Sequence, residues 1–213
     1  MGTQRERDET RWYSGMNGNL IPVTKHEVRA RLLHLAEEVT DDHPDRLSQR
    51  WLRDHSLSAV PIEGGVPFGI CARLRRIWRA YSESTSASLY LVVLDFDPGA
   101  PRELYVVSGT MEEFGRTFKE VSRANWLLTP EDGTLLVLNT TGEHYVVAGS
   151  MAFVRRTAGC KPATAHRRYG EFAQAWSDER IRRYHLDIAK HYAEFANQGV
   201  LSKNPKSSRS RKR

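Results

Sequence analysis

Two segments in the middle of the chain are so similar that they restrict the possible folds more than any other feature. Residues 103–117 read ELYVVSGTMEEFGRT, and residues 143–157 read EHYVVAGSMAFVRRT. Aligned without gaps, they are identical at eight of fifteen positions, namely Glu103/Glu143, Tyr105/Tyr145, Val106/Val146, Val107/Val147, Gly109/Gly149, Met111/Met151, Arg116/Arg156 and Thr117/Thr157. Just upstream, the apolar residues 91–95 parallel residues 135–139. Such similarity within one chain indicates an internal duplication of one supersecondary unit.

Each copy has the pattern of two strands followed by a helix. An apolar strand enters a turn rich in Gly, Pro, Asp or Thr, and a second apolar strand returns. The shared glycine, Gly109 or Gly149, is expected to have a positive φ or a tight backbone contact that a side chain would resist. Thr110 or Ser150 then supplies the N-cap oxygen of a helix. Each copy therefore predicts one ββα unit.

The strands of these units are apolar on consecutive positions. Residues 89–94 read LYLVVL, whereas a half-exposed antiparallel strand would alternate polar and apolar side chains. We therefore predict an α+β fold with a four-stranded antiparallel sheet, built from the duplicated ββα unit over residues 89–121 and 134–158 and covered by helices on both faces. The two unit helices should share one face. Helices predicted at 24–39 and 167–197 should cover the other.

Charge divides the chain into a neutral body and a basic tail. Residues 202–213 contain six basic residues and no acid, namely Lys203, Lys206, Arg209, Arg211, Lys212 and Arg213. These six equal the whole net charge of +6, so residues 1–201 sum to about zero. Basic, Ser and Pro residues without apolar anchors favour disorder. We predict a flexible arm at 1–20, a single α+β domain at 21–201 and a disordered tail at 202–213.

The rest of the composition is that of a globular protein in a reducing compartment. A chain of 213 residues can bury a sizeable core. No run approaches the roughly 18–20 apolar residues that span a bilayer, so no membrane association is predicted. The N-terminus is charged with no apolar stretch behind it, so we expect no secretory signal. The two cysteines, Cys71 and Cys160, lie far apart, which favours a cytoplasmic protein without disulfides.

One predicted helix carries a run of positive charge. Ile70, Leu74, Ile77, Trp78 and Tyr81 have helical spacing and form an apolar face. The other face carries the arginines that we select as a candidate anion or nucleic-acid site together with the basic residues of the tail: Arg73, Arg75, Arg76 and Arg79.

The Gly-rich segment 63–69 precedes this helix, so its backbone N–H groups could surround an anion. The segment lacks the Gly-Lys-Ser/Thr ending of a phosphate-binding loop, and the alternative is a plain connection.

Catalytic and metal-binding patterns are not evident. The chain has no H-E-x-x-H, C-x-x-C or G-x-G-x-x-G motif. Asp187, His191 and Glu194 share one face of the predicted C-terminal helix and could contribute to a metal site, but no second element offers further ligands. The alternative is a solvated face with weak i,i+4 pairing. We predict no catalytic residue, no metal and no cofactor, and favour a protein that is not an enzyme.

Three functions remain open at this point. The junction at residues 145–154 (YVVAGSMAFV) resembles those of small bacterial immunity or accessory proteins; this resemblance concerns structure and implies no functional residue. The first hypothesis is a non-enzymatic protein that binds another protein, as an immunity or accessory protein or a complex subunit. The second is a nucleic-acid-associated accessory factor that uses the basic helix and tail. The third is a small-ligand sensor with a pocket between the two repeats.

Overall fold

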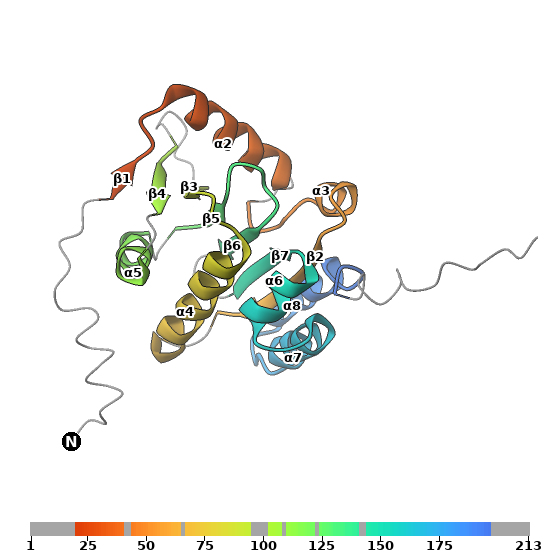
Figure 1. Ribbon diagram of the computed structural model, residues 1–213. Coiled ribbons are helices and arrows are strands. Elements are labelled where there is room, and N and C mark those ends of the chain that lie inside the picture. The colour runs from red at the N-terminus through yellow and green to blue at the C-terminus, as the bar shows by residue number, and fades with distance from the viewer. Residues whose placement is uncertain are drawn as a thin grey trace, which may run out of the picture.

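The computed structural model describes residues 20–40, 44–64, 67–94, 102–107, 110–121, 124–140 and 144–196. This part of the chain forms one seven-stranded antiparallel sheet with seven helices (Figure 1). The strands are β1 (Ile21–Pro22), β2 (Ser58–Glu63), β3 (Leu89–Val93), β4 (Leu104–Val107), β5 (Trp126–Thr129), β6 (Leu136–Thr140) and β7 (His144–Gly149). The helices are α2 (His26–Val39), α3 (Gln49–Asp54), α4 (Pro67–Ser84), α5 (Met111–Glu120), α6 (Met151–Ala158), α7 (Pro162–Gln174) and α8 (Glu179–His191).

The prediction of a four-stranded sheet is wrong, because three further strands join it. The strand order is β1-β4-β3-β5-β6-β7-β2. β5 lies in the centre, while β1 and β2 form the edges. Pro61 and the glycines after Glu63 are typical of a loop, yet Pro61 pairs with Val146 in the ladder. β5 has four residues that are all buried, and it belongs to neither of the two similar segments.

The two similar segments form hairpins that open in opposite directions. β3 and β6 run the same way, because each is antiparallel to β5, which lies between them. β4 pairs with β3 on the side away from β5, and β7 pairs with β6 on its own side away from β5. Both following helices, α5 and α6, pack on the same face. A rotation therefore cannot superimpose the two ββα units, and the sheet is not built from two equivalent copies.

Helices cover both faces of the sheet. Leu91 and Val93 of β3 belong to the core cluster beneath α4, α5 and α6, whereas Tyr90 and Val92 belong to the cluster beneath α2, α3 and α8. Apolar residues on consecutive positions are thus buried on opposite sides. α7 lies along the edge strand β2, and α4 lies between α5 and α6 (Figure 1). The space between the two unit helices, where a ligand pocket was predicted, therefore holds a helix.

Gly149 has the constrained geometry expected from the sequence. Its φ is +154°, and a Cβ built there would lie 2.8 Å from Phe153 Cδ1 and 3.0 Å from Leu135 Cδ2. The next residue, Ser150, caps α6 by accepting a hydrogen bond from the Phe153 N–H at 3.2 Å. The equivalent Gly109, almost all of the predicted arm and all of the predicted tail lie outside the described residues.

Among the described residues, no helix combines the length and the apolar character needed to cross a bilayer.

Candidate functional site

The candidate site is a pocket with a volume of about 150 Å³ between α4, α6, α7 and the end of β2. The apolar residues Leu74, Ile77 and Tyr81 of α4 pack against the sheet. The arginines beside them therefore lie on the side of α4 that adjoins α6 and α7. The pocket is lined by Ile62, Glu63, Arg73, Arg76, Thr157, Ala158, Cys160, Ala165, Arg168 and Tyr169.

Three arginines line this pocket and have no partner among the described residues. No hydrogen bond or ion pair joins Arg73, Arg76 or Arg168 to another described side chain or carbonyl. Some arginines elsewhere do have such partners: Arg31 pairs with Glu131, Arg53 with Glu194, and Arg156 with Glu83. Positive charge is therefore concentrated in the pocket without being neutralised by ion pairs.

Arg73 is the most constrained of the three. Its side chain is half-buried, and its Nη1 is fully buried with no hydrogen-bond partner in the described part of the chain. Burial lowers the pKa of Arg73 below its usual range; nearby Tyr145 and Glu63 oppose this, while Arg76 adds to it. A guanidinium nevertheless keeps its proton in a protein, because its ordinary pKa exceeds 12. Arg73 thus places a permanent charge where it is only partly solvated.

Arg76 reaches the pocket over a glycine. Gly159 ends α6 in the left-handed conformation with φ of +70°, and its N–H donates to the carbonyls of Arg155 and Arg156. A Cβ at Gly159 would lie only 2.8 Å from Arg76 Nη1. The glycine therefore serves both the end of the helix and the close approach of the guanidinium.

Only two of the four helix arginines selected from the sequence line the pocket. Arg73 and Arg76 line the pocket, whereas Arg75 and Arg79 are exposed and do not. Arg168 was missed, because it comes from α7 and reaches α4 only through tertiary packing. The tail residues lie outside the described residues: Lys203, Lys206, Arg209, Arg211, Lys212 and Arg213. Residues 65–66 of the Gly-rich segment 63–69 also lie outside the described residues. The strand β2 ends at Glu63, the first residue of this segment.

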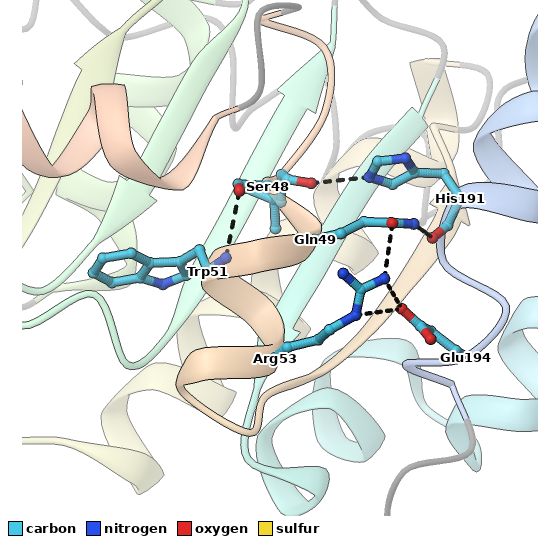
Figure 2. A network of polar contacts seen from close by, with 7 residues as sticks. Ser48, Gln49, Trp51, Arg53, His191 and Glu194 are labelled. Carbon is cyan, nitrogen blue, oxygen red and sulfur yellow. Dashed lines mark hydrogen bonds and ion pairs between the residues drawn. The ribbon is translucent and has the colours of Figure 1, made fainter.

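Two of the three polar residues of the candidate metal site, His191 and Glu194, have structural partners instead. Figure 2 shows Gln49 and Arg53 of α3 facing His191, the last residue of α8, and Glu194 just beyond it. Gln49 Nε2 donates to the His191 carbonyl at 2.6 Å, and Arg53 Nη2 donates to Glu194 Oε1 at 2.6 Å. His191 Nε2 donates to the Leu47 carbonyl at 3.0 Å. No group of three or more potential metal-ligating side chains occurs among the described residues.

A second polar site, buried and closed, lies on the opposite face of the sheet. We call it the histidine cluster, and it consists of His144, Tyr169, Tyr184 and His185. His144 and His185 are fully buried, with ring centroids 5.7 Å apart. Tyr169 Oη shares a 2.7 Å hydrogen bond with His185 Nδ1, and Thr140 Oγ1 lies 3.0 Å from His144 Nδ1. Burial lowers the pKa of His144 to about 3, with smaller contributions from His185 and Arg46.

Comparison with known proteins does not identify the chain: no protein-family model, no curated protein and no solved structure matches it.

Proposed function

We propose that this protein binds a small anionic group in the arginine-lined pocket. The observation that carries the proposal is the buried Nη1 of Arg73, which has no hydrogen-bond partner among the described residues and lies beside Arg76 and Arg168. A buried donor without a partner costs free energy, and more so when it is charged. Arginine cannot remove this cost by losing its proton. An anion from solution would supply both the missing acceptor and the missing negative charge.

The size of the pocket restricts the ligand. Pockets for drug-sized molecules have volumes of roughly 300–1,000 Å³, and this one has about 150 Å³. It therefore suits a phosphoryl, sulfate or carboxylate group, and the rest of a larger ligand would remain outside. Arg76 and Arg168 are exposed, so the group has a route in from solvent. Guanidinium groups suit such a ligand, because their planar N–H forks match the oxygens of these anions.

Binding is favoured over catalysis by the residues that line the pocket. Among the described residues of the lining there is no histidine, and Glu63 is the one carboxylate. The lining therefore offers no pairing of a nucleophile with a general base of the Ser–His or Cys–His kind.

The test is a titration with inorganic phosphate at constant ionic strength, followed by calorimetry and by the unfolding midpoint. We expect phosphate to bind and to raise the midpoint, because a ligand that binds only the folded state stabilises it by about 2.7 kcal/mol at a hundredfold excess over Kd. Arg73→Met should abolish binding, and Arg168→Met should weaken it. Arg79→Met is the matched control, because Arg79 is exposed on α4 outside the pocket. Binding that survives both pocket substitutions, or that is lost equally in the control, would reject the proposal.

A further inference from the structure

We infer that the pocket prefers a doubly charged phosphoryl group, as in a phosphate monoester, over singly charged anions such as a carboxylate or a sulfate ester. This inference rests on the proposed function and specifies its ligand. It follows from the charges and the hydrogen-bond donors that the pocket brings together.

The charges of the lining residues have a simple sum. Arg73, Arg76 and Arg168 contribute +3 and Glu63 contributes −1, which leaves +2 in the pocket. A phosphate monoester carries a charge of about −1.5 to −2 at pH 7. It therefore neutralises the pocket almost completely, whereas a carboxylate or a sulfate ester leaves one positive charge uncompensated.

The number of donors favours a group with three terminal oxygens over a carboxylate, whereas the charge separates a phosphate from a sulfate ester. A phosphoryl group has three terminal acceptor oxygens, and three guanidinium groups face the pocket. A carboxylate has two oxygens, so it can occupy two of these groups fully and leaves the third with a weaker interaction. Arg73 contributes a buried donor, and Arg76 and Arg168 contribute exposed ones.

Glu63 provides a way to change the charge without altering the arginines. It is the last residue of β2 and is held in register opposite His144 of β7. Its side chain is exposed and acts on Arg73 electrostatically. Glu63→Gln raises the pocket charge to +3, and Arg168→Met lowers it to +1. Arg168→Lys keeps the charge at +2 and so controls for loss of the arginine side chain itself.

Phenyl phosphate, phenyl sulfate and benzoate separate charge from shape. The first two share a ring and a tetrahedral group with three terminal oxygens, but at pH 8 the phosphate is a dianion and the sulfate a monoanion. We expect phenyl phosphate to bind the wild-type protein at least about tenfold more tightly than phenyl sulfate or benzoate, because a second charge interacts with the same positive field. Inorganic phosphate, titrated in parallel, distinguishes the free anion from its ester as the ligand; a preference for either one supports the inference.

The phosphate-to-sulfate affinity ratio should follow the charge of the pocket. It should increase in Glu63→Gln, decrease in Arg168→Met and stay near wild type in Arg168→Lys, with folding of each variant verified by its unfolding midpoint. Equal affinities for the two esters, or a ratio that does not change across the variants, would overturn this inference and leave anion binding in place. Failure of every anion to bind the wild-type protein would reject the proposed function as well.

Discussion

His144 and Tyr145 are neighbours on β7, but their side chains lie on opposite faces of the sheet beside two different polar sites. His144 packs in the closed histidine cluster against His185. Tyr145 lies near Arg73 of the open arginine-lined pocket. Tyr169 connects the two, because it lines the pocket while its hydroxyl reaches His185.

In each site we compare a buried nitrogen that has no hydrogen-bond partner in the described part of the chain. These are Nε2 of His144 and Nη1 of Arg73. Histidine can adapt to burial by remaining neutral, and the lowered pKa of His144 shows that it does so. Arginine has no neutral form near physiological pH. A buried nitrogen therefore indicates a missing ligand only where its charge is permanent and the site is open to solvent.

The largest expected effect is a loss of folding stability at low pH. It tests whether the folded protein requires His144 to be neutral. The pKa of His144 is about 3 in the folded protein and 6.5 for an exposed histidine, so the unfolded chain binds the proton first as the pH falls. The contribution of neutral His144 to the free energy of unfolding is therefore complete above pH 6.5. It decreases as the pH falls toward 3, by about 1.4 kcal/mol per pH unit. Urea unfolding between pH 8 and pH 4 measures the decrease.

His144→Phe should flatten this pH dependence, because it keeps a ring in the cluster and removes the titrating group. Thr140 still has an acceptor in the variant, since its hydroxyl also donates to the backbone carbonyl of residue 144 at 3.2 Å. His34→Phe, on the exposed side of α2, is the control. The comparison between the two sites breaks down if His144→Phe and the wild type lose stability in parallel.

An intermediate effect is expected at Gly149, which lies at the far end of β7 from both sites. Gly149→Ala should lower the free energy of unfolding by about 1 kcal/mol or more, because the φ of +154° and the contact with Phe153 resist a methyl group. Gly170→Ala in α7 is the matched control, since nothing lies within 4 Å of a Cβ there; it should stabilise the helix by up to about 1 kcal/mol. Both variants should retain the wild-type acid slope. A changed slope would mean that the histidine cluster depends on overall stability.

The smallest effect compares two arginines in buffer that contains no binding anion. Arg53→Met removes an ion pair whose side chains are 52% and 51% exposed, so a loss of up to about 1 kcal/mol is expected. Arg73→Met removes a half-buried cation that has no hydrogen-bond or ion-pair partner in the described part of the chain, so the free energy of unfolding of this variant should equal or exceed that of the wild type. Urea unfolding measures the free energy of unfolding of both variants and of the wild type. A larger loss for Arg73→Met would show that its charge already has a partner within the protein.

Local sequence signals predicted two helix caps correctly, whereas the single helix predicted at 167–197 is wrong, because α7 ends at Gln174 and α8 begins at Glu179. Thr110 and Ser150 cap helices as expected, with Thr110 and Glu113 forming a reciprocal capping box. The side of the sheet on which each hairpin lies cannot be predicted from local sequence, because it depends on the position of β5 between β3 and β6. For the same reason the run of charge identified Arg73 and Arg76, but not Arg168 ninety-two positions beyond Arg76. Protein-binding, immunity and nucleic-acid functions stay predictions, because they depend on partners that no pattern within the chain specifies.

The edge strand β2 has a consequence for how the protein behaves at high concentration. Along an antiparallel strand, alternate N–H groups point away from the paired neighbour. On β2 the Ala59 N–H points outward and bonds to the Phe195 carbonyl at 3.4 Å. The next outward position is Pro61, which has no N–H. An approaching strand from another molecule would find one donor occupied and the next absent, so this edge resists the intermolecular sheet growth that leads to aggregation.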